Sequence, residues 1–498
     1  MTQLSFFFEP DKQQPKILTQ GVFSHDGIGE DKERITLEEN YKHLLEETDE
    51  FNRQLVSFQA NKTETLHSWI KYREGFSASL VDLLIKKYKF EPDDIIVDPF
   101  AGSCTTLLVA KMRGINAVGI ELLPHCHLAW EAKSRAFDYS VKELQKLEKI
   151  IHNALPPNTT KTFKHLTITK TAFPPQIEKD LMQYSEWFQN LEISTNTKIL
   201  CQLILTSILE EISYTRKDGQ YLRWDGRAKK IQVYNQNRLA KGKKAIKGIN
   251  KGDLPDVKNA FLTKLEKIIT DIIELQKEQL SPSHQQLIKG NTLFELATMK
   301  KDHFAGVITS PPYANRYDYT RTYALELAFL DIGDEIFNLR QEQLSCTVEN
   351  KSKLNDLEEF YKKIGQLDRF NSISEVIQNN KVLSEINTAL VKRMELNEIN
   401  NKGVLPMINQ YFSELTFVFA ELQRICKSGA YIAFVNDNVR YAGEIIPVDL
   451  LSTNLAEQVG FRPVKVFVLP QRKGNSSQQM SKYGRVALRK SITIWQKA

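Results

Sequence analysis

Two short segments carry residue types whose spacing could support chemistry. The first, DPFAGSCTT at residues 98–106, joins a predicted strand to a predicted helix. A turn at that position presents backbone N–H groups and the positive end of the helix to a ligand, and Gly102 lets the backbone come close. Asp98 could bind an ammonium group. Glu121 ends the next predicted strand, 23 residues later, where a carboxylate suits the two hydroxyls of a ribose.

The second segment, Ser310-Pro311-Pro312-Tyr313, follows a predicted strand at residues 305–309. Two prolines fix two φ angles and remove two donors, so the turn is stiff and its carbonyls are free to accept hydrogen bonds. The Ser310 side chain and a turn carbonyl could accept from an exocyclic base amine, whose lone pair is otherwise delocalised into the ring. Tyr313 offers a face on which a flipped base could stack, worth about 1–3 kcal/mol. Attack on a reactive methyl group would then depend mainly on positioning.

Together the two segments resemble those of the site-specific DNA amino-methyltransferases, which methylate N4 of cytosine or N6 of adenine. The resemblance covers residues 65–135, 287–330 and 406–498. It implies S-adenosyl-L-methionine as cofactor, double-stranded DNA as substrate and the SPPY residues as the catalytic turn. The SPPY spelling favours cytosine N4, because adenine-N6 enzymes more often contain DPPY or NPPY. We therefore expect a cytosine-N4-specific enzyme that protects sites from a restriction endonuclease encoded alongside it.

The same resemblance implies a set of cofactor-binding residues. Residues around 72–80 would pack on the methionine moiety, Glu121 would bind the ribose, and Gly290-Asn291 would meet the adenine ring. The full set is Tyr72, Phe76, Ser77, Asp98, Pro99, Phe100, Ala101, Gly102, Ser103, Thr105, Glu121 and Asn291. Two positions depart from the family pattern: Cys104 stands where glycine is common, and Asn291 stands where an acid is more usual.

Several other functions use some of the same features. Adenine-N6 methylation would need the same residues. A catalytically silent subunit that only binds DNA would not need both segments, and an RNA or tRNA base methyltransferase would differ in its substrate. A Rossmann oxidoreductase would leave SPPY without a role, and a GxGxxG run is absent. Cytosine-C5 methylation needs a nucleophilic cysteine, normally in a Pro-Cys turn, and no cysteine here follows a proline.

The elements that must position these segments alternate between strand and helix. Predicted strands lie at residues 95–97, 117–121, 287–290, 305–309, 430–435, 464–469 and 491–495. Predicted helices lie at 105–113, 198–212, 257–276, 411–426 and 448–459, with a turn at 427–429. The first strand–helix–strand unit implies a parallel sheet with a right-handed crossover. We expect an α/β fold with a doubly wound, Rossmann-like methyltransferase sheet interrupted by mostly helical insertions.

The chain divides accordingly into six regions. They are an N-terminal extension (1–60), a first core segment with the cofactor site (61–139), an insertion that is the candidate target-recognition region (140–286), a second core segment with SPPY (287–329), a helical insertion (330–405) and a third core segment (406–498).

Positive charge is concentrated in one stretch of the first insertion. Residues 216–251 contain twelve Lys and Arg against two acids, whereas the whole chain has a net charge of +6. A local surplus of this kind is expected where phosphates are bound, and interleaved aromatics could stack on bases. A solvated basic loop is the alternative. The candidate DNA contacts are Arg216, Lys217, Arg223, Arg227, Lys229 and Lys230.

The remaining composition is that of a soluble globular protein, with 41% hydrophobic and 26% charged residues. No apolar run approaches the roughly 18 residues of a membrane span, and the N-terminus lacks a secretory signal. Five cysteines without CxxC pairing predict reduced thiols and a cytoplasmic location. His125-Cys126-His127 has the residue types of a metal site, but adjacent side chains point in different directions, so we expect no metal.

Overall fold

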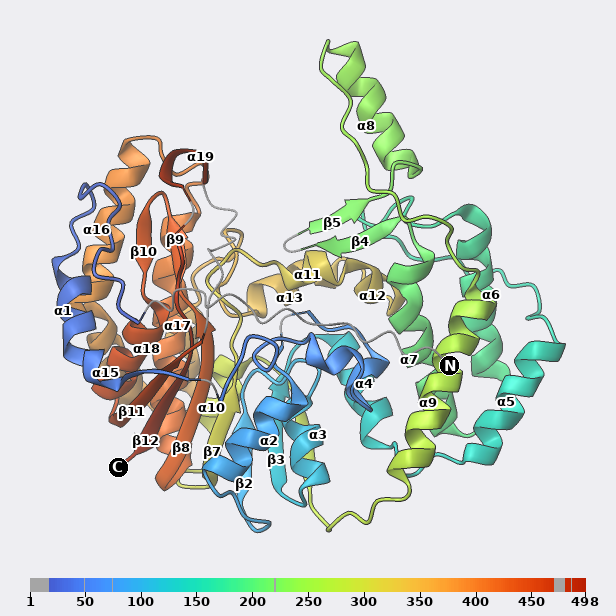
Figure 1. The fold of residues 1–498 in the computed structure, drawn as a ribbon, viewed down its shortest axis with the longest axis horizontal. Coiled ribbons are helices and arrows are strands. Elements are labelled where there is room, and N and C mark those ends of the chain that lie inside the picture. Colours follow the sequence, from blue (N-terminus) through green and yellow to red (C-terminus); the bar gives the residue numbers. More distant parts are fainter. Residues whose placement is uncertain (1–17, 49, 74, 219–220, 470–479, 485) are drawn as a thin grey trace, which may run out of the picture.

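The computed structural model describes residues 18–48, 50–73, 75–218, 221–469, 480–484 and 486–498. Within these residues the fold is built on an eight-stranded sheet, flanked by a helical body from which a helical arm projects (Figure 1). In the described ranges, no helix combines the length and the apolar character needed to cross a membrane.

The central sheet is mostly parallel. Its strands, in spatial order, are β1 (Leu45–Glu47), β11 (Phe461–Val468), β12 (Lys490–Lys497), β8 (Cys426–Asp437), β7 (Phe304–Thr309), β2 (Ile95–Asp98), β3 (Asn116–Glu121) and β6 (Gln285–Lys289). Every neighbouring pair is parallel except those of β12, which runs antiparallel to both β11 and β8. The predicted α/β class is confirmed as a mixed α/β fold around a large, mostly parallel sheet.

Helices cover both faces of this sheet, because alternate residues of each strand point to opposite sides. On β2, Ile96 packs with α2 (Ala78–Lys87) and α3 (Thr105–Met112), while its neighbour Val97 packs on the opposite face. That second face is covered by α10 (Thr292–Thr298), α17 (Val404–Ile425) and α18 (Val448–Gln458). The loop after β2 therefore begins at a strand that is buried on both sides.

The first insertion forms the helical body at the right of Figure 1. Its helices pack with α4 and α12 around a core of their own. The elements are α4 (Pro124–Ser134), α5 (Val141–Asn153), α6 (Pro175–Asn190), α7 (Thr195–Ile212), α9 (Val257–Leu275), α11 (Tyr319–Thr322) and α12 (Ala324–Phe329). A hairpin of β4 (Thr215–Asp218) and β5 (Tyr221–Trp224) leads into α8 (Lys229–Ala240), which stands away from this body (Figure 1).

The second insertion belongs largely to the helical layer of the sheet. Its helices are α13 (Glu335–Glu342), α14 (Leu354–Lys363), α15 (Leu367–Gln378) and α16 (Lys381–Glu395). Both α15 and α16 pack directly on α17, and their apolar residues join the same core as the strands. These helices thus help to hold α17 against the sheet.

The N-terminal segment adds a strand that the sequence analysis did not predict. After α1 (Lys32–Tyr41), β1 pairs in parallel with β11, and Leu45 lies opposite Val466. Arg34, on α1, forms an ion pair with Glu444 of β10 (Glu444–Ile446) at 3.0 Å, and both side chains are fully buried. Residues 1–17 of the predicted extension lie outside the described residues of the chain.

Most predicted element boundaries agree with the structure to within a few residues, and the exceptions have local causes. The helix predicted at 411–426 begins at Val404, because Pro406 falls in its first turn, where a missing N–H does no harm. The turn predicted at 427–429 lies inside β8, where the register with β7 shifts and Gly429 has φ +83°. A bulge and a glycine with positive φ therefore replace the predicted turn.

Candidate active site and nucleic-acid-binding surface

The two chemically distinctive segments line one pocket at the carboxyl ends of β2, β3 and β7. The pocket is open to solvent, spans about 620 Å³ including the solvent at its mouth, and is formed partly by apolar side chains and partly by polar groups. Seven residues nominated from the sequence line it: Tyr72, Pro99, Phe100, Glu121, Asn291, Ser310 and Pro312. Because a crevice at the carboxyl ends of parallel strands is the usual ligand site of open α/β sheets, its position agrees with its residue content.

Asp98 does not line this pocket. Its carboxylate is 1% exposed and accepts hydrogen bonds from the Thr106 hydroxyl (2.7 Å), the Thr309 hydroxyl (2.7 Å) and the Phe100 N–H (3.1 Å). Burial raises the pKa of Asp98 to about 6, although these three donors lower it. The Asp98 side chain ties β2 to α3 and to the end of β7, and its contact with an ammonium group stays a prediction. Its contribution to the site is to position the loop.

Glu121 and Gly102 are joined directly. The Glu121 carboxylate accepts hydrogen bonds from the backbone N–H groups of Gly102 (2.7 Å), Leu122 (2.9 Å) and Leu123 (2.7 Å). Burial raises the pKa of Glu121 to about 7. The carboxylate therefore fixes the loop and also presents a face to the pocket.

Gly102 is required by its backbone and by its neighbour. It has φ +52°, and a Cβ there would lie 2.9 Å from the ring of Tyr72. Tyr72 is buried and stacks on Tyr323 with ring centroids 5.5 Å apart. Cys104, which also has a positive φ of 64°, is buried and precedes α3. The loop thus makes its close turn with a glycine at one position and a strained cysteine at the other.

Other nominated residues lie behind the pocket. Ser77 is buried and caps α2 by accepting from the Leu80 N–H at 3.1 Å. Phe76 packs in the apolar core between the sheet and α2–α3. The remaining nominated members of the loop are also buried: Ala101, Ser103 and Thr105.

Asn291 takes a different role from the acid that is usual at its position. Its side-chain oxygen accepts from the Leu293 N–H at 3.0 Å and caps α10. The next residue, Thr292, donates a hydrogen bond to the carbonyl of Pro99, which ties this turn to the loop after β2. The asparagine therefore both lines the pocket and fixes one of its walls.

The proline turn places Ser310 and Tyr313 side by side. The Ser310 hydroxyl lies 3.2 Å from the Tyr313 hydroxyl and 3.2 Å from the carbonyl of Val435 on β8. Lys490 lies over the Tyr313 ring, with its Nζ 5.1 Å from the ring centroid, and pairs with Asp437 at 3.0 Å. Pro311 is buried. One edge of the turn thus faces the pocket while the tyrosine faces the ends of β8 and β12.

Sequence reasoning missed one wall of the pocket. Glu342, Gln343 and Leu344 line it from the end of α13, in the second insertion, and Tyr319 lines it from α11. Leu122 and Leu123 follow Glu121 directly and could have been found from that adjacency. No local pattern marks residues 342–344, because their place depends on how the insertion folds back over the sheet.

The predicted DNA contacts separate into exposed and buried groups. Lys217 does not fit its predicted role: it is 3% exposed, forms an ion pair with the buried Glu326, and lies 4.7 Å from the centroid of the Tyr323 ring. Arg216, its neighbour on β4, is exposed. The alternation of a strand directs one inward and the other outward.

The other four predicted DNA contacts are at least partly exposed, and three have intramolecular partners. Arg223 pairs with Asp218 at 2.8 Å, Arg227 pairs with Asp225 at 2.9 Å, and Lys230 lies 4.6 Å from the centroid of the Trp224 ring. Lys229 begins α8 and is exposed. A phosphate would have to compete with the partners of Arg223 and Arg227.

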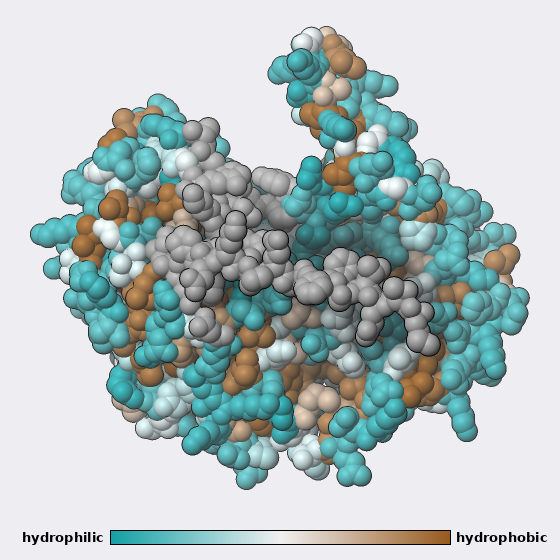
Figure 2. Space-filling model, in the orientation of Figure 1, coloured by the Kyte–Doolittle hydropathy of each residue, from teal (hydrophilic) through white to brown (hydrophobic). Residues whose placement is uncertain are grey.

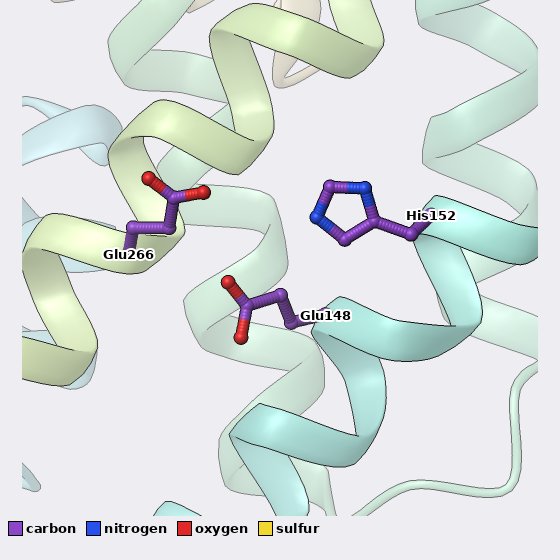
Figure 3. A group of neighbouring side chains, drawn as sticks. All are labelled: Glu148, His152 and Glu266. Carbon is purple, nitrogen blue, oxygen red and sulfur yellow. The ribbon is translucent and has the colours of Figure 1, made fainter.

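The possible metal ligands lie apart from the pocket or are used otherwise. The ring of His125 stacks on Tyr323 at 4.4 Å, and burial lowers its pKa to about 3. On the helical body, Glu148 and His152 of α5 meet Glu266 of α9, with ligand atoms within 4.8 Å of one another (Figure 3). Glu266 and His152 are exposed, and exposed groups of this kind commonly meet on helix surfaces without an ion.

Comparison with known proteins gives consistent matches. Residues 7–131 match the family model N6_N4_Mtase, described as DNA methylase. The chain is 55% identical over 478 residues to the Type II methyltransferase M.BsoBI of Geobacillus stearothermophilus, covering 95% of this chain and 94% of the relative. It is 37% identical over 471 residues to the Type II methyltransferase M.AvaI of Nostoc sp., covering 93% and 92%. No solved structure matched.

Proposed function

The chain belongs to the Type II DNA methyltransferases of the amino-methyltransferase family, and on that premise we propose that it methylates N4 of cytosine at a specific sequence in double-stranded DNA. The methyl donor is S-adenosyl-L-methionine. The observation that supports this proposal is the single pocket lined by residues of both the loop after β2 and the SPPY turn. A donor bound by the loop would lie beside the turn that holds the acceptor.

The residues of the pocket suit an adenosine bearing a charged amino-acid tail. Glu121 offers a carboxylate for the ribose hydroxyls, while Phe100 and Leu293 offer apolar surfaces for a purine. Asn291 brings an amide to the same wall. When bound, S-adenosyl-L-methionine supplies an electrophilic methyl group. The role of the chain is to orient it through the loop that Glu121 and Asp98 hold in place.

The SPPY turn would orient the acceptor amine. Ser310 and a carbonyl of the turn accept hydrogen bonds from the exocyclic N–H groups, which directs the nitrogen lone pair at the methyl group. Tyr313 lies outside the lining of the pocket and has Lys490 over its ring, so a flipped base would have to take the other ring face; stacking there would offset some of the cost of unstacking, which is a few kcal/mol. The SPPY spelling supports cytosine as the base. By protecting its sites, such an enzyme would act in the cytoplasm beside a cognate restriction endonuclease.

The proposal is tested by incubating the protein with mixed-sequence duplex DNA and S-adenosyl-L-methionine, digesting the DNA and identifying nucleosides by mass spectrometry. N4-methylcytosine supports it. N6-methyladenine would keep the mechanism and replace the base. Methylation of RNA but not of DNA would point to an RNA methyltransferase. No methylation of a DNA that contains every short sequence would point to a catalytically silent subunit that only binds DNA.

Two substitutions test the roles within the turn. Ser310→Ala and Tyr313→Ala should keep cofactor binding, measured by calorimetry, and lose turnover. Ser281→Ala is the matched control, because Ser281 is exposed and precedes the amino end of β6, whereas the pocket lies at the carboxyl ends of the strands. If Ser310→Ala kept the rate within a few-fold of the parent, the catalytic assignment would be wrong.

A further inference from the structure

A helical arm projects from the body of the protein. It comprises residues 226–251, which contain α8 and the segment that returns from it to the body (Figure 1). Figure 2 shows it standing clear of the main surface, with hydrophilic and hydrophobic residues mingled along it. A helix of 12 residues is about 18 Å long, so the arm has the reach to follow several base pairs of a duplex.

Packing does not explain why this arm is helical. Ile231 is the single buried side chain of α8, whose whole length the structure describes, whereas Val233, Tyr234 and Leu239 are 45%, 49% and 60% exposed. An isolated helix of this length is marginal in water. The large apolar side chains that it exposes mark a surface suited to a partner.

The arm is nevertheless held in one shape by the returning segment. The Asn235 side chain donates to the Ile246 carbonyl at 3.0 Å and accepts from the Ile246 N–H at 2.8 Å. The Arg238 guanidinium donates to the Lys244 carbonyl at 2.8 Å. These bonds join the second half of the helix, at Asn235 and Arg238, to the returning segment.

The base of the arm is fixed to the body. The Arg227 guanidinium donates to both carboxylate oxygens of Asp225, at 2.9 and 3.0 Å, and to the carbonyl of Gly252. The Lys251 ammonium donates to three carbonyls at the end of α7 and the start of β4. The two chain segments approach so closely that a Cβ on Gly248 would lie 2.5 Å from the Gly226 nitrogen. These contacts therefore anchor the base of the arm to the body.

The body in turn connects the arm to the catalytic turn. The hairpin that carries the arm packs on α11 through β5 and pairs with α12 through Lys217 and Glu326. Helices α11 and α12 follow the SPPY turn directly, and Tyr319 of α11 lines the pocket. A duplex whose base enters the pocket would therefore meet the arm at a fixed position.

The exposed chemistry of the arm is of two kinds. Between residues 226 and 252 there is no acidic residue, and the end of the arm carries Arg238, Lys241, Lys243, Lys244 and Lys247. The structure pairs none of these five with a described carboxylate. On the helix itself, Gln232, Gln236 and Asn237 are exposed; Gln232 and Gln236 lie one turn apart, Asn237 follows Gln236, and the Gln232 amide donates to the Arg227 carbonyl at 3.2 Å. Cations suit phosphates, and Gln and Asn amides suit the adenine edge in the major groove.

We propose that α8 enters the major groove beside the flipped base, where Gln232, Gln236 and Asn237 read base edges and the four lysines of the returning segment contact phosphates. The proposal rests on the proposed function as a DNA methyltransferase. The width of the major groove admits an α-helix, and the rigid base would hold this helix at one register from the target base.

The first experiment compares two double variants with the same residue types. Gln236→Ala/Asn237→Ala removes two of the reading amides, while Gln189→Ala/Asn190→Ala removes the same exposed dipeptide at the end of α6. Methylation is measured as kcat/KM on the cognate site and on sites with one base pair changed. The arm variant should lose roughly 5- to 150-fold on the cognate site and lose discrimination at one or two positions. The control should match the parent.

The second experiment measures the salt dependence of DNA binding for a variant with alanine at Lys241, Lys243, Lys244 and Lys247. Its slope of log affinity against log salt should fall by about 3 to 4, with discrimination between sites unchanged. The control is the quadruple alanine variant of four exposed lysines outside the arm: Lys300, Lys301, Lys362 and Lys363. In a third variant, two glycines replace residues 236–245 and connect Asn235 to Ile246, which already contact each other. This variant should keep cofactor binding, lose discrimination between sites and show the smaller salt slope.

These outcomes separate the arm from the proposed function. If the parent protein methylates DNA and the arm variants keep both discrimination and salt slope, the arm proposal is overturned and the proposed function stands. The arm proposal would also be overturned if the arm bound RNA more tightly than DNA and the arm variants discriminated between DNA sites as well as the parent does. If the parent protein methylates no DNA, the proposed function itself fails.

Discussion

Lys217 provides a sharp test, because its residue type and its environment predict different effects. As one of twelve cations in a basic stretch it would bind phosphate, whereas its position in the structure is internal. The side chains of Lys217 and Glu326 are 3% and 5% exposed and pair with each other. We therefore expect Lys217→Met to lower stability and to leave the salt dependence of DNA binding unchanged.

The magnitude follows from the carboxylate left behind. Removing one partner of a buried ion pair typically costs about 3–5 kcal/mol, because the remaining charge is uncompensated. Burial already holds the pKa of Glu326 above its ordinary value although Lys217 lowers it, so loss of the lysine raises that pKa further. A raised carboxyl pKa in the folded state means that stability is lost as pH rises. The loss in free energy of unfolding caused by Lys217→Met should therefore be smaller at pH 5 than at pH 8.

The assay is urea denaturation followed by circular dichroism at both pH values, together with DNA binding at several salt concentrations. Arg216→Met is the matched control: it lies on the same strand but faces solvent, and should keep its stability while reducing the salt slope by about 1. Lys217→Met/Glu326→Leu should recover most of the loss, since an apolar pair can replace a buried ion pair. A lower salt slope for Lys217→Met at unchanged stability would refute the reasoning.

Three further predictions concern the pocket and the core. Gly102→Ala should weaken cofactor binding about tenfold in calorimetry, because φ +52° costs an alanine about 1–2 kcal/mol and its Cβ would press on Tyr72. Gly333→Ala is the control: Gly333 has φ +56° but no neighbour within 4 Å, so this variant should keep the cofactor affinity of the parent. Because burial raises the pKa of Asp98 to about 6, stability should fall as pH rises from about 4 to 6, and Asp98→Asn should flatten that range of the thermal denaturation profile. Glu444→Gln removes a charge shared by two fully buried arginines and should cost about 3–5 kcal/mol in urea, with catalysis of the folded fraction unchanged.

Local patterns were sufficient for the elements that carry the chemistry. β2 and β3 are apolar runs that end at an acid, and the helix between them starts after a glycine-containing turn. β1 was not predicted because a strand of three residues is too short to show a periodic pattern. Its position is set by pairing with β11, in which Leu45 lies opposite Val466, far along the chain. Such non-local pairing leaves no trace in a window of sequence.

The site was predictable by residue type more than by contact. The motif singled out Asp98 as a ligand-binding residue, but Asp98 lies outside the lining of the pocket, and its partners Thr106 and Thr309 are brought together only when α3 and β7 pack on β2. The DNA-contact prediction for Lys217 does not fit the structure because composition gives the number of charges but not their burial. Gln343 was missed for a third reason: it reaches the pocket through the fold of an insertion that has no recognisable motif.

The placement of β12 has a consequence for how the protein is made. Residues 490–497 follow every other described strand of the sheet in the chain, yet they insert between β11 and β8 inside the sheet. The strands around the loop after β2 can pair before β12 is made, whereas β1 must wait for β11, and the two halves of the sheet stay unjoined until β12 is made. Contacts of such long sequence separation form slowly and expose unpaired edges meanwhile. Premature termination just before Lys490 would therefore release a chain with a split sheet and two open edges, a substrate for chaperones and proteases.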